Sequence, residues 1–260
     1  MSERRLRSIA AAYLLAFVGI VAFSFLALLL VRAMYPDRSP VELTQGLPAL
    51  LAGTLASATA LLLTIVIVLR PLDAAALRLL PGRETGPSLA AMILGTLTLG
   101  QTLDSAVALL GLTNRGAMAV IRRALEGAAG PELFLAVLVI GVIAGGAEEA
   151  FFRGYLQTSL REHVSAVTAI GLTSLGFAVF HLDWVHGALA FGLGLWLGYI
   201  TERTGSALPA CACHMVNNAL FTLLTAFGVT IEGIASNAIL GATSLIVFAG
   251  CAVVVTRLPD

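Results

Sequence analysis

The chain has 260 residues, of which 58% are apolar and only 12% are charged, and its mean hydropathy is +0.96. This composition is far from that of a soluble domain and predicts an all-α polytopic membrane protein that is embedded in the lipid bilayer. The formal net charge is zero, so bulk electrostatics predict no nucleic-acid partner.

Eight stretches are long and apolar enough to be predicted as membrane spans, since a helix needs about 20 residues to cross a bilayer. Together they predict a single integral membrane domain over residues 1–260, built as a bundle of about eight transmembrane helices. The predicted spans are roughly 8–31, 47–69, 88–112, 132–156, 164–182, 184–201, 207–228 and 234–256. Only the first, second and eighth are apolar throughout. Polar groups in the others are costly in hydrocarbon, so we expect a polar intramembrane cavity.

The third span and the connection after it contain polar residues outside the main motifs. Gln101 and Asp104 can line a cavity, although a hydrogen bond to a neighbouring helix is the more common role for such residues. Residues 113–131 carry arginines among alanines. This pattern predicts an interfacial helix that lies on the membrane and is stopped by Gly130–Pro131.

Small residues recur every four positions in two of the spans. Gly141 and Gly145 share a face of the fourth span, and Ala190, Gly194 and Gly198 share a face of the sixth. Small residues let helix backbones approach closely in lipid, where apolar side chains alone give no drive for association. We therefore predict tight helix packing at both places, which would hold a polar cluster in fixed geometry.

The fourth span ends in the sequence GGAEEAFFRGY, which places two adjacent carboxylates in an apolar run. Glu149 and Arg153 are four residues apart and share a helix face, whereas Glu148 is turned about 100° away. We predict that Arg153 neutralises Glu149 and leaves Glu148 free, and one paired and one free carboxylate suit acid/base chemistry. The alternative is a helix end at the membrane surface whose charged side chains reach the water.

Two histidines also fall within or at the end of predicted spans. His181 closes the fifth span one turn after Phe177, and His214 lies inside the seventh span one turn before Asn218. Each histidine alone is more often a packing residue than a catalyst. Together with the two glutamates, however, they put polar groups at comparable ends of three helices, and such groups in lipid need one another as partners. We predict that they surround a small aqueous cavity.

This cavity has two possible chemistries. Glu148 can deprotonate a water molecule that His181 steadies, while His214 and Asn218 donate hydrogen bonds to a tetrahedral oxyanion. Alternatively, a glutamate and the two histidines can hold zinc, with water as the fourth ligand. The helical zinc-protease signature H-E-x-x-H is absent from the sequence, which weakens the zinc alternative.

Several other residues receive structural interpretations or none. His186 is predicted to lie in the short turn between the fifth and sixth spans, next to Trp184, which suits an anchor at the membrane interface. Asn217 is turned away from Asn218 and is assigned no role. The three cysteines lie in apolar runs without the spacing of a zinc site and are interpreted as packing residues.

Three motifs in this order resemble those of the CPBP family, the CAAX-processing and bacteriocin-processing intramembrane proteases that include CAAX prenyl protease 2 and are also called Abi proteins. The motifs are E-E-x-x-x-R (Glu148, Glu149, Arg153), F-x-x-x-H (Phe177, His181) and H-x-x-x-N (His214, Asn218). The resemblance covers about residues 130–225, the expected catalytic core.

The resemblance implies a glutamate-dependent intramembrane peptidase without a metal cofactor. It implies a cytoplasm-facing cavity in which Glu148 activates water and Asn218 helps to stabilise the oxyanion, with both motif histidines lining the site. It also implies that Glu149 and Arg153 mainly hold the motif helix in place. Phe177 is likewise given a supporting role, since it lies one turn before His181 and can pack on its ring. The expected substrate is a peptide or protein. Family members that act as scaffolds or immunity proteins suggest a non-catalytic alternative.

A proton-coupled transporter is an alternative from another class, since intramembrane Glu, His and Asp residues also mark proton paths. Two features argue against it, namely the lack of an internal two-fold repeat and the gathering of polar groups toward one side of the membrane. A second polar cluster reaching the opposite face would favour the transporter.

The arginines predict the orientation, because basic loops tend to stay in the cytoplasm. Arginine is the only basic residue in the sequence, which with abundant Ala, Leu and Gly is typical of a GC-rich bacterial genome. The end of the bundle with both termini collects nine arginines: Arg4, Arg5, Arg7, Arg70, Arg78, Arg83, Arg161, Arg203 and Arg257. The other end collects five: Arg32, Arg38, Arg115, Arg122 and Arg123. We predict a bacterial cytoplasmic membrane protein with both termini in the cytoplasm and the two motif glutamates toward the cytoplasmic half.

Overall fold

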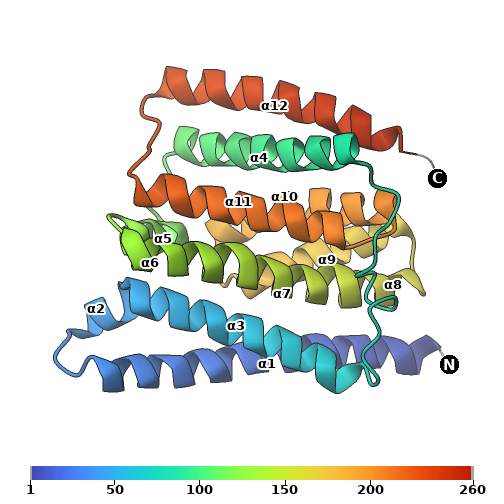
Figure 1. The fold of residues 1–260 in the computed structure, drawn as a ribbon, viewed down its shortest axis with the longest axis horizontal. Coiled ribbons are helices and arrows are strands. Elements are labelled where there is room, and N and C mark those ends of the chain that lie inside the picture. Colours follow the sequence, from blue (N-terminus) through green and yellow to red (C-terminus); the bar gives the residue numbers. More distant parts are fainter. Residues whose placement is uncertain (1, 259–260) are drawn as a thin grey trace.

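Long helices lying side by side make up the protein (Figure 1). The computed structural model describes residues 2–258, and all regular structure in that part of the chain is helical. The long helices outside the motif segment are α1 (Ser2–Met34), α3 (Leu47–Val68), α4 (Gly86–Leu109), α9 (Ala166–Phe180), α10 (Trp184–Thr204), α11 (Leu208–Ala226) and α12 (Ile234–Thr256). The short helices α2 (Pro40–Gln45) and α5 (Gly116–Leu125) lie at one end of the bundle, whereas α1 begins and α12 ends at the other.

The motif segment is one continuous helix over Gly130–Arg161. It runs through α6 (Gly130–Ala136), η1 (Val137–Ala144), α7 (Gly145–Glu149), η2 (Ala150–Gln157) and α8 (Thr158–Arg161). The segments η1 and η2 are π-helical, with hydrogen bonds one residue longer than in an α-helix, a geometry that is rare and often found at functional sites. The two adjacent glutamates therefore lie in a short α-helical segment between two π-helical segments.

Each of the eight predicted spans corresponds to a long helix, but within residues 2–258 six helices are long and apolar enough to cross a membrane. Those six are α1, α3, α4, the Gly130–Arg161 helix, α10 and α12. Helix α9 has only 15 residues, about 22 Å of helix, which is shorter than the roughly 30 Å hydrocarbon core. Helix α11 has 19 residues but is less apolar, because it carries a histidine and two asparagines. The predicted number of about eight spans is thus confirmed only for six.

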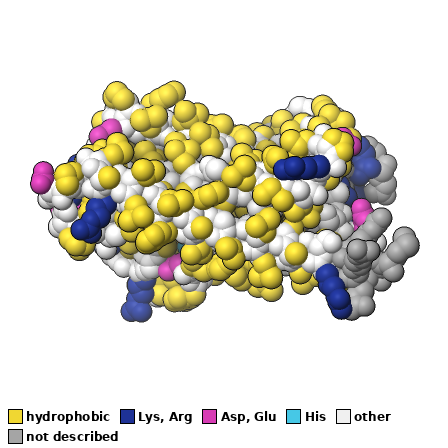
Figure 2. Space-filling model, turned by 90° about the horizontal axis from the view of Figure 1, so that it is seen from below, with side chains coloured by type: hydrophobic (Ala, Val, Ile, Leu, Met, Phe, Trp, Pro, Cys, Tyr) yellow, Lys and Arg dark blue, Asp and Glu magenta, His cyan; other side chains and the backbone are white. Residues whose placement is uncertain are grey.

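The surface agrees with a membrane environment. Figure 2 shows apolar side chains over the middle of one face, with most of the visible charged side chains toward the two ends. Large apolar side chains are exposed along the outer helices, for example Leu30 on α1 and Ile246 on α12. With six helices able to span, these exposed apolar faces make the protein an integral membrane protein.

The small residues of the motif helix lie directly against α11. A Cβ atom at Gly141 would lie 3.1 Å from the Cβ of Ala219, and one at Gly145 would lie 3.3 Å from the Cα of Met215. On the other side of the motif helix, a Cβ atom at Gly194 would lie 3.2 Å from Nη2 of Arg153. The predicted close packing is therefore confirmed, and it brings three helices together around the motif.

Gly141→Ala is expected to lower the free energy of unfolding by about 1–3 kcal/mol, because the added methyl group would press on the backbone of α11. Gly250→Ala is the matched control, since nothing lies within 4 Å of a Cβ atom there and alanine favours the helix by up to about 1 kcal/mol. Unfolding of both variants in mixed detergent micelles would measure the difference. Equal stability of the two variants would contradict the close contact.

Helix α5 is shorter than the predicted interfacial helix and ends before the predicted stop. It ends at Leu125, and Gly130 begins the motif helix with Pro131 in its first turn. The expectation that Gly130–Pro131 stops the interfacial helix is therefore wrong. Proline is well tolerated in a first helical turn, where its missing N–H group has no helical partner in any case.

An aromatic cluster joins the motif helix to α9 and α1. The rings of Phe152 and Phe177 lie 5.0 Å apart, and the ring of Phe180 contacts those of Phe152 and Tyr13 at 5.2 Å and 4.7 Å. Edge-to-face contacts of this kind fix the rotation of one helix against another. The cluster therefore sets the position of Phe177 next to the motif glutamates.

Candidate active site

A cavity of about 630 Å³ lies between the helices and contains all four predicted catalytic residues. Glu148 from α7, His181 at the end of α9, and His214 and Asn218 from α11 all line it. Phe177 also forms part of the wall. Polar residues that are far apart in the sequence thus line one cavity.

Glu149 and Arg153 form the predicted ion pair. Nη1 of Arg153 lies 2.7 Å from Oε1 of Glu149, and both side chains are fully buried. The guanidinium also donates through Nη2 to the carbonyl oxygen of Gly194, at 3.1 Å, and lies over the ring of Phe177 at 4.9 Å. The absence of a side chain at Gly194 makes room for this contact. Glu149 and Arg153 therefore connect the motif helix to α10 and α9.

His214 binds Glu149 as well, a contact that we did not predict. Its Nδ1 atom lies 2.7 Å from Oε1 of Glu149, so this carboxylate oxygen accepts from both His214 and Arg153. Because an ionised carboxylate only accepts, Nδ1 of His214 carries the proton. The other ring nitrogen, Nε2, faces Glu148 at 3.6 Å from its Oε2. Glu149 thereby orients the histidine toward the second glutamate.

The two adjacent glutamates occupy different environments. The side chain of Glu149 is fully buried in its contacts with Arg153 and His214, whereas that of Glu148 is 22% exposed and lines the cavity. This difference follows from the helix rotation between neighbouring residues and matches the predicted division into a paired and a free carboxylate. Glu148 is therefore the carboxylate that water in the cavity can reach.

His181 is oriented by its own helix. Its Nδ1 atom lies 2.9 Å from the carbonyl oxygen of Phe177, which can only accept, so Nδ1 carries the proton and Nε2 is the free nitrogen of the neutral ring. The Phe177 ring lies edge-on to both His181 and His214, at 4.8 Å and 5.7 Å between ring centres. Phe177 therefore packs against both histidine rings.

The amides of α11 are only loosely engaged. Nδ2 of Asn218 lies 3.4 Å from the carbonyl oxygen of Ile140, and its Oδ1 accepts from Nδ2 of Asn217 at 3.4 Å. Both distances are at the long end for hydrogen bonds. Asn217, to which we assigned no role, also lines the cavity. Both amide groups are thus available to a molecule bound there.

His186 lies in the site, and the prediction that it occupies the turn is wrong. It belongs to the first turn of α10, lines the cavity, and its ring centre lies 4.1 Å from that of His181. The turn itself ends at Asp183, which caps α10. The sequence does contain a signal for this, because an aspartate three residues before His186 is typical of a helix N-cap.

Gln101 and Asp104 also line the cavity. Nε2 of Gln101 donates to Oγ of Ser105 at 3.2 Å, and Asp104 pairs with Arg122 of α5. Both residues line the cavity, and Asp104 also makes the expected contact to a neighbouring helix, whereas Gln101 binds a residue of its own helix. The Asp104–Arg122 pair ties α5 to α4 beside the cavity.

Asp183 holds α5 against the start of α10. Its carboxylate accepts from the backbone N–H groups of His186 at 2.8 Å and Ala117 at 3.1 Å. Gly116, with φ of +64°, allows this approach, because a Cβ atom there would lie 2.2 Å from Oδ2 of Asp183. The backbone hydrogen bond from His186, with that from Ala117, lowers the pKa of Asp183 against the opposing effect of burial.

This lowered pKa predicts a pH dependence of stability. A carboxyl group whose pKa is lower in the folded state stabilises the protein above its unfolded pKa of about 3.9, and this contribution is lost as the pH falls through the folded-state pKa. The advantage of the wild type over Asp183→Asn in thermal-unfolding midpoint is therefore expected to shrink between about pH 5 and pH 3. A difference that stays constant over this range would contradict the prediction.

A buried polar ladder continues from Glu149 toward the end of the bundle that holds both termini. Residues 149, 153, 157 and 161 recur at four-residue spacing on the motif helix and face residues 194, 198 and 202 of α10. Nε2 of the fully buried Gln157 donates to the carbonyl oxygen of Gly198 and to Oε1 of Glu202, both at 3.0 Å. Glu202 also pairs with Arg161, at 3.0 Å, and with Arg78, at 2.9 Å. We did not predict Gln157 or Glu202 as part of this arrangement.

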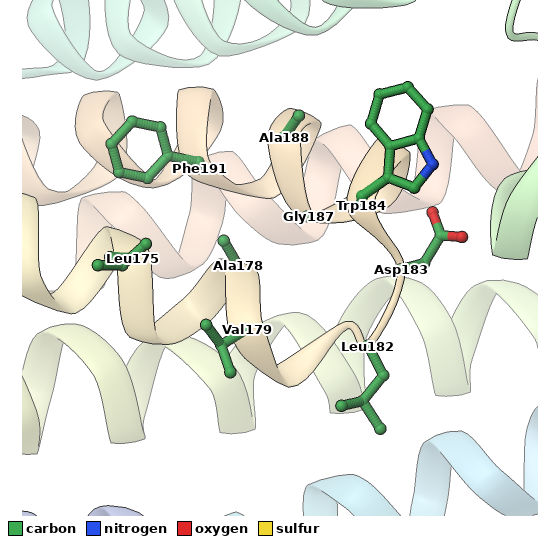
Figure 3. Close-up of a pocket in the computed structure, with 9 residues that line it drawn as sticks. All are labelled: Leu175, Ala178, Val179, Leu182, Asp183, Trp184, Gly187, Ala188 and Phe191. Carbon is green, nitrogen blue, oxygen red and sulfur yellow. The ribbon is translucent and has the colours of Figure 1, made fainter.

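A second pocket of about 460 Å³ lies between α9 and α10 (Figure 3). Its wall is mainly apolar, with residues such as Leu175, Val179 and Phe191, and Asp183 is the only one of its nine lining residues with a charge. Trp184, which is 68% exposed, forms its rim and suits the predicted interfacial anchor. Since none of the predicted catalytic residues lines this pocket, the larger cavity is the candidate active site.

The cavity extends from the middle of the bundle toward the end that is distant from both termini. Glu148 and His214 line it near the middle of the bundle, and the rest of its wall comes mainly from the later parts of α4, α9 and α11 and the earlier parts of α3 and α10, together with α5 and the α11–α12 connection. These parts all lie at the α2 and α5 end in Figure 1. The arginines predicted cytoplasmic termini, and the family resemblance implied a cytoplasm-facing cavity. Because the cavity extends toward the end of the bundle opposite the termini, only one of these two expectations can hold.

Among residues 2–258, no group of three His, Cys, Asp or Glu side chains has a geometry that could hold a metal ion. Each of the two motif histidines is bound through its Nδ1 atom, His181 to the carbonyl oxygen of Phe177 and His214 to the carboxylate of Glu149. Cys211, Cys213 and Cys251 are free and buried, as expected of packing residues.

Residues 130–220 match the family model described as Rce1-like, type II CAAX prenyl endopeptidase. This segment contains all three motifs, so the match confirms the resemblance to the CAAX-processing protease family. The comparison with curated proteins found no match, and the comparison with solved structures also found none.

Proposed function

We propose, from the resemblance of residues 130–220 to type II CAAX prenyl endopeptidases, that this integral membrane protein is an intramembrane endopeptidase using a water molecule activated by Glu148. The observation that carries the proposal is the pair of adjacent glutamates with separate environments, one buried with Arg153 and one lining the cavity next to His214. The substrate is a peptide or protein segment that enters the cavity.

In the proposed reaction, the Glu148 carboxylate takes a proton from water, and the oxygen of that water forms a bond to the carbonyl carbon of the scissile peptide. His181 accepts a hydrogen bond from this water through Nε2, since its Nδ1 is bound to Phe177. Glu148 then gives the proton to the leaving nitrogen as the C–N bond breaks. The products are a new carboxyl terminus and a new amine.

Negative charge on the carbonyl oxygen is stabilised by donors from α11 in this proposal. Nδ2 of Asn218 is only weakly bound to Ile140 and can turn to the oxyanion. His214 is the second donor in this proposal, through Nε2 of its protonated ring, while its Nδ1 is held by Glu149. Glu149 is therefore a positioning residue and Arg153 its counter-ion.

Hydrolysis is tested directly by incubating the purified protein with candidate peptides in water enriched in ¹⁸O. One labelled oxygen in the new carboxyl terminus of a product is expected, because the attacking oxygen comes from water. A protein that binds such peptides tightly but never releases labelled product would instead be the non-catalytic scaffold or immunity protein.

The zinc-dependent alternative makes a different prediction. In the glutamate mechanism, incubation with a chelator such as EDTA is expected to leave the rate unchanged within about two-fold, because no step uses a metal. Loss of activity with chelator, its recovery with added zinc, and stoichiometric zinc in the purified protein would together support the metal mechanism.

The buried ladder on the motif helix bears on the transporter alternative, because it reaches toward the opposite face. Its members between Glu149 and Glu202 are Arg153 and Gln157. A guanidinium does not lose its proton in proteins, and an amide does not titrate. The ladder therefore cannot relay protons from the cavity, and it serves as a structural connection between the motif helix and α10.

A further inference from the structure

The entrance of the cavity can be assigned to one end of the bundle. The connection between α11 and α12 forms part of its wall through Val229, Thr230 and Ile231, all of which are exposed. Helix α5 contributes Ala117 and Arg122 to the same rim. Both segments lie at the end of the bundle away from the start of α1 and the end of α12.

The end of the bundle that holds both termini is closed by packed side chains. Arg153 and Gln157 are fully buried there and hydrogen-bonded to backbone carbonyls of α10. Thr204 and Ser206 are buried where the connection from α10 to α11 packs on the loop before α4. A peptide can therefore reach Glu148 only from the α5 end or between helices from the lipid.

The order and direction of the helices place each of the fourteen arginines counted above at the same end of the bundle that the sequence predicted for it. Nine lie at the end with the termini and five at the end with the entrance, of which one, Arg122, is paired with Asp104 on the cavity wall. The connections are all short, which is the condition under which basic residues set the orientation of a membrane protein. The end with nine arginines is the one retained in the cytoplasm.

We infer that the cavity opens to the extracytoplasmic side of the membrane, and that its substrate is an apolar peptide segment on that side, such as the outer end of a membrane-spanning segment. The orientation rests on the fold and the charges, and the substrate class rests also on the proposed function. The cavity wall fits such a segment, because it is mostly apolar and its only charged side chains are Asp104, Arg122 and Glu148. A prenylated peptide in the cytoplasm would meet the closed end.

Cysteine labelling tests the orientation without any activity measurement. Thr230→Cys places a thiol at the entrance, and Ala76→Cys places one in the exposed loop between α3 and α4 at the other end. Intact bacterial cells making each variant are treated with a membrane-impermeant maleimide and compared with lysed cells. The parent protein is the background control, since its three cysteines are buried.

The expected result is that Thr230→Cys is labelled in intact cells and Ala76→Cys only after lysis. A cytoplasmic thiol protein monitors leakage in the same samples. Any other pattern overturns the inference: labelling of Ala76→Cys alone would mean that the cavity opens to the cytoplasm, and labelling of both would mean that the chain inserts in two orientations.

A second measurement separates the orientation from the proposed function. A membrane-impermeant apolar peptide joined to a charged tag is added to right-side-out and to inside-out membrane vesicles containing the protein. Hydrolysis in right-side-out vesicles only is expected, and hydrolysis in inside-out vesicles only would overturn the substrate class. If neither preparation cleaves while the thiols label as expected, the orientation stands, and the proposed function and the substrate class fail together.

Discussion

Glu148→Gln is expected to reduce the rate of peptide hydrolysis by about 10²- to 10⁴-fold, the usual contribution of a general base. Glutamine keeps the size of the side chain but cannot take a proton from water. Because Glu148 faces the cavity and is not part of the buried ion pair, the variant should fold with a thermal-unfolding midpoint close to that of the parent.

Glu132→Gln provides the matched control for this experiment. Glu132 lies in the same continuous helix but is exposed near its start, so its replacement should leave both rate and stability unchanged. Initial rates of product formation, followed by mass spectrometry on protein of verified folding, measure both variants. Undiminished hydrolysis by Glu148→Gln would remove the glutamate from the mechanism and leave the geometry of the cavity without its proposed chemistry.

Arg153→Met is expected to lower the free energy of unfolding by about 3–5 kcal/mol, because it leaves the carboxylate of Glu149 buried without its cation. Methionine fills part of the space next to Phe177, so the loss comes mainly from charge. Arg161→Met is the control on the same ladder: Arg161 is partly exposed, and an ion pair in that setting contributes about 0–1 kcal/mol.

The double variant Glu149→Gln/Arg153→Met separates charge from packing. If the unpaired charge causes the loss, removing it should recover much of the stability, although activity should stay low because His214 loses its orienting carboxylate. The free energy of unfolding in mixed detergent micelles is measured for the parent protein, the two single variants and the double variant. Equal, small effects of Arg153→Met and Arg161→Met would show that the buried pair contributes little.

Buried polar contacts link the motif helix to α10 and α11 and hold the site together. Glu149 accepts from Arg153 on its own helix and from His214 on α11, and Arg153 in turn donates to the backbone of α10. Small residues at positions 141, 145 and 194 allow these three helices to approach. A buried, fully packed carboxylate can therefore hold a histidine in place for its exposed neighbour Glu148.

The contacts that were predicted correctly are those within a single helix. The Glu149–Arg153 pair and the edge-on contact of Phe177 with His181 follow from residues four apart, whose side chains meet whenever the segment is helical. The separate environments of Glu148 and Glu149 follow in the same way, from the rotation between neighbours. The apolar spans and the family resemblance of the three motifs were likewise readable, because neither depends on how the helices are arranged.

The contacts that were missed lie between helices. The bond from His214 to Glu149, the place of His186 beside His181, and the contact of Gln157 with Glu202 each depend on the depth and rotation of one helix against another. Hydropathy does not encode these quantities. The four-residue spacing on the motif helix and on α10 is a visible signal, but it does not say that the two rows face each other.

By itself, the sequence determined that this chain is a helical membrane protein and that Glu149 and Arg153 form an ion pair within one of its helices. It also determined which residue types are available for hydrolysis. Those properties arise from hydrophobicity and from the 3.6-residue repeat, which act over a few turns. Only the tertiary structure decided that the groups of three helices meet in one cavity and that this cavity lies away from both termini. Each depends on how close and at what angle helices pack, and in lipid that is set by small residues and buried polar contacts from distant parts of the chain.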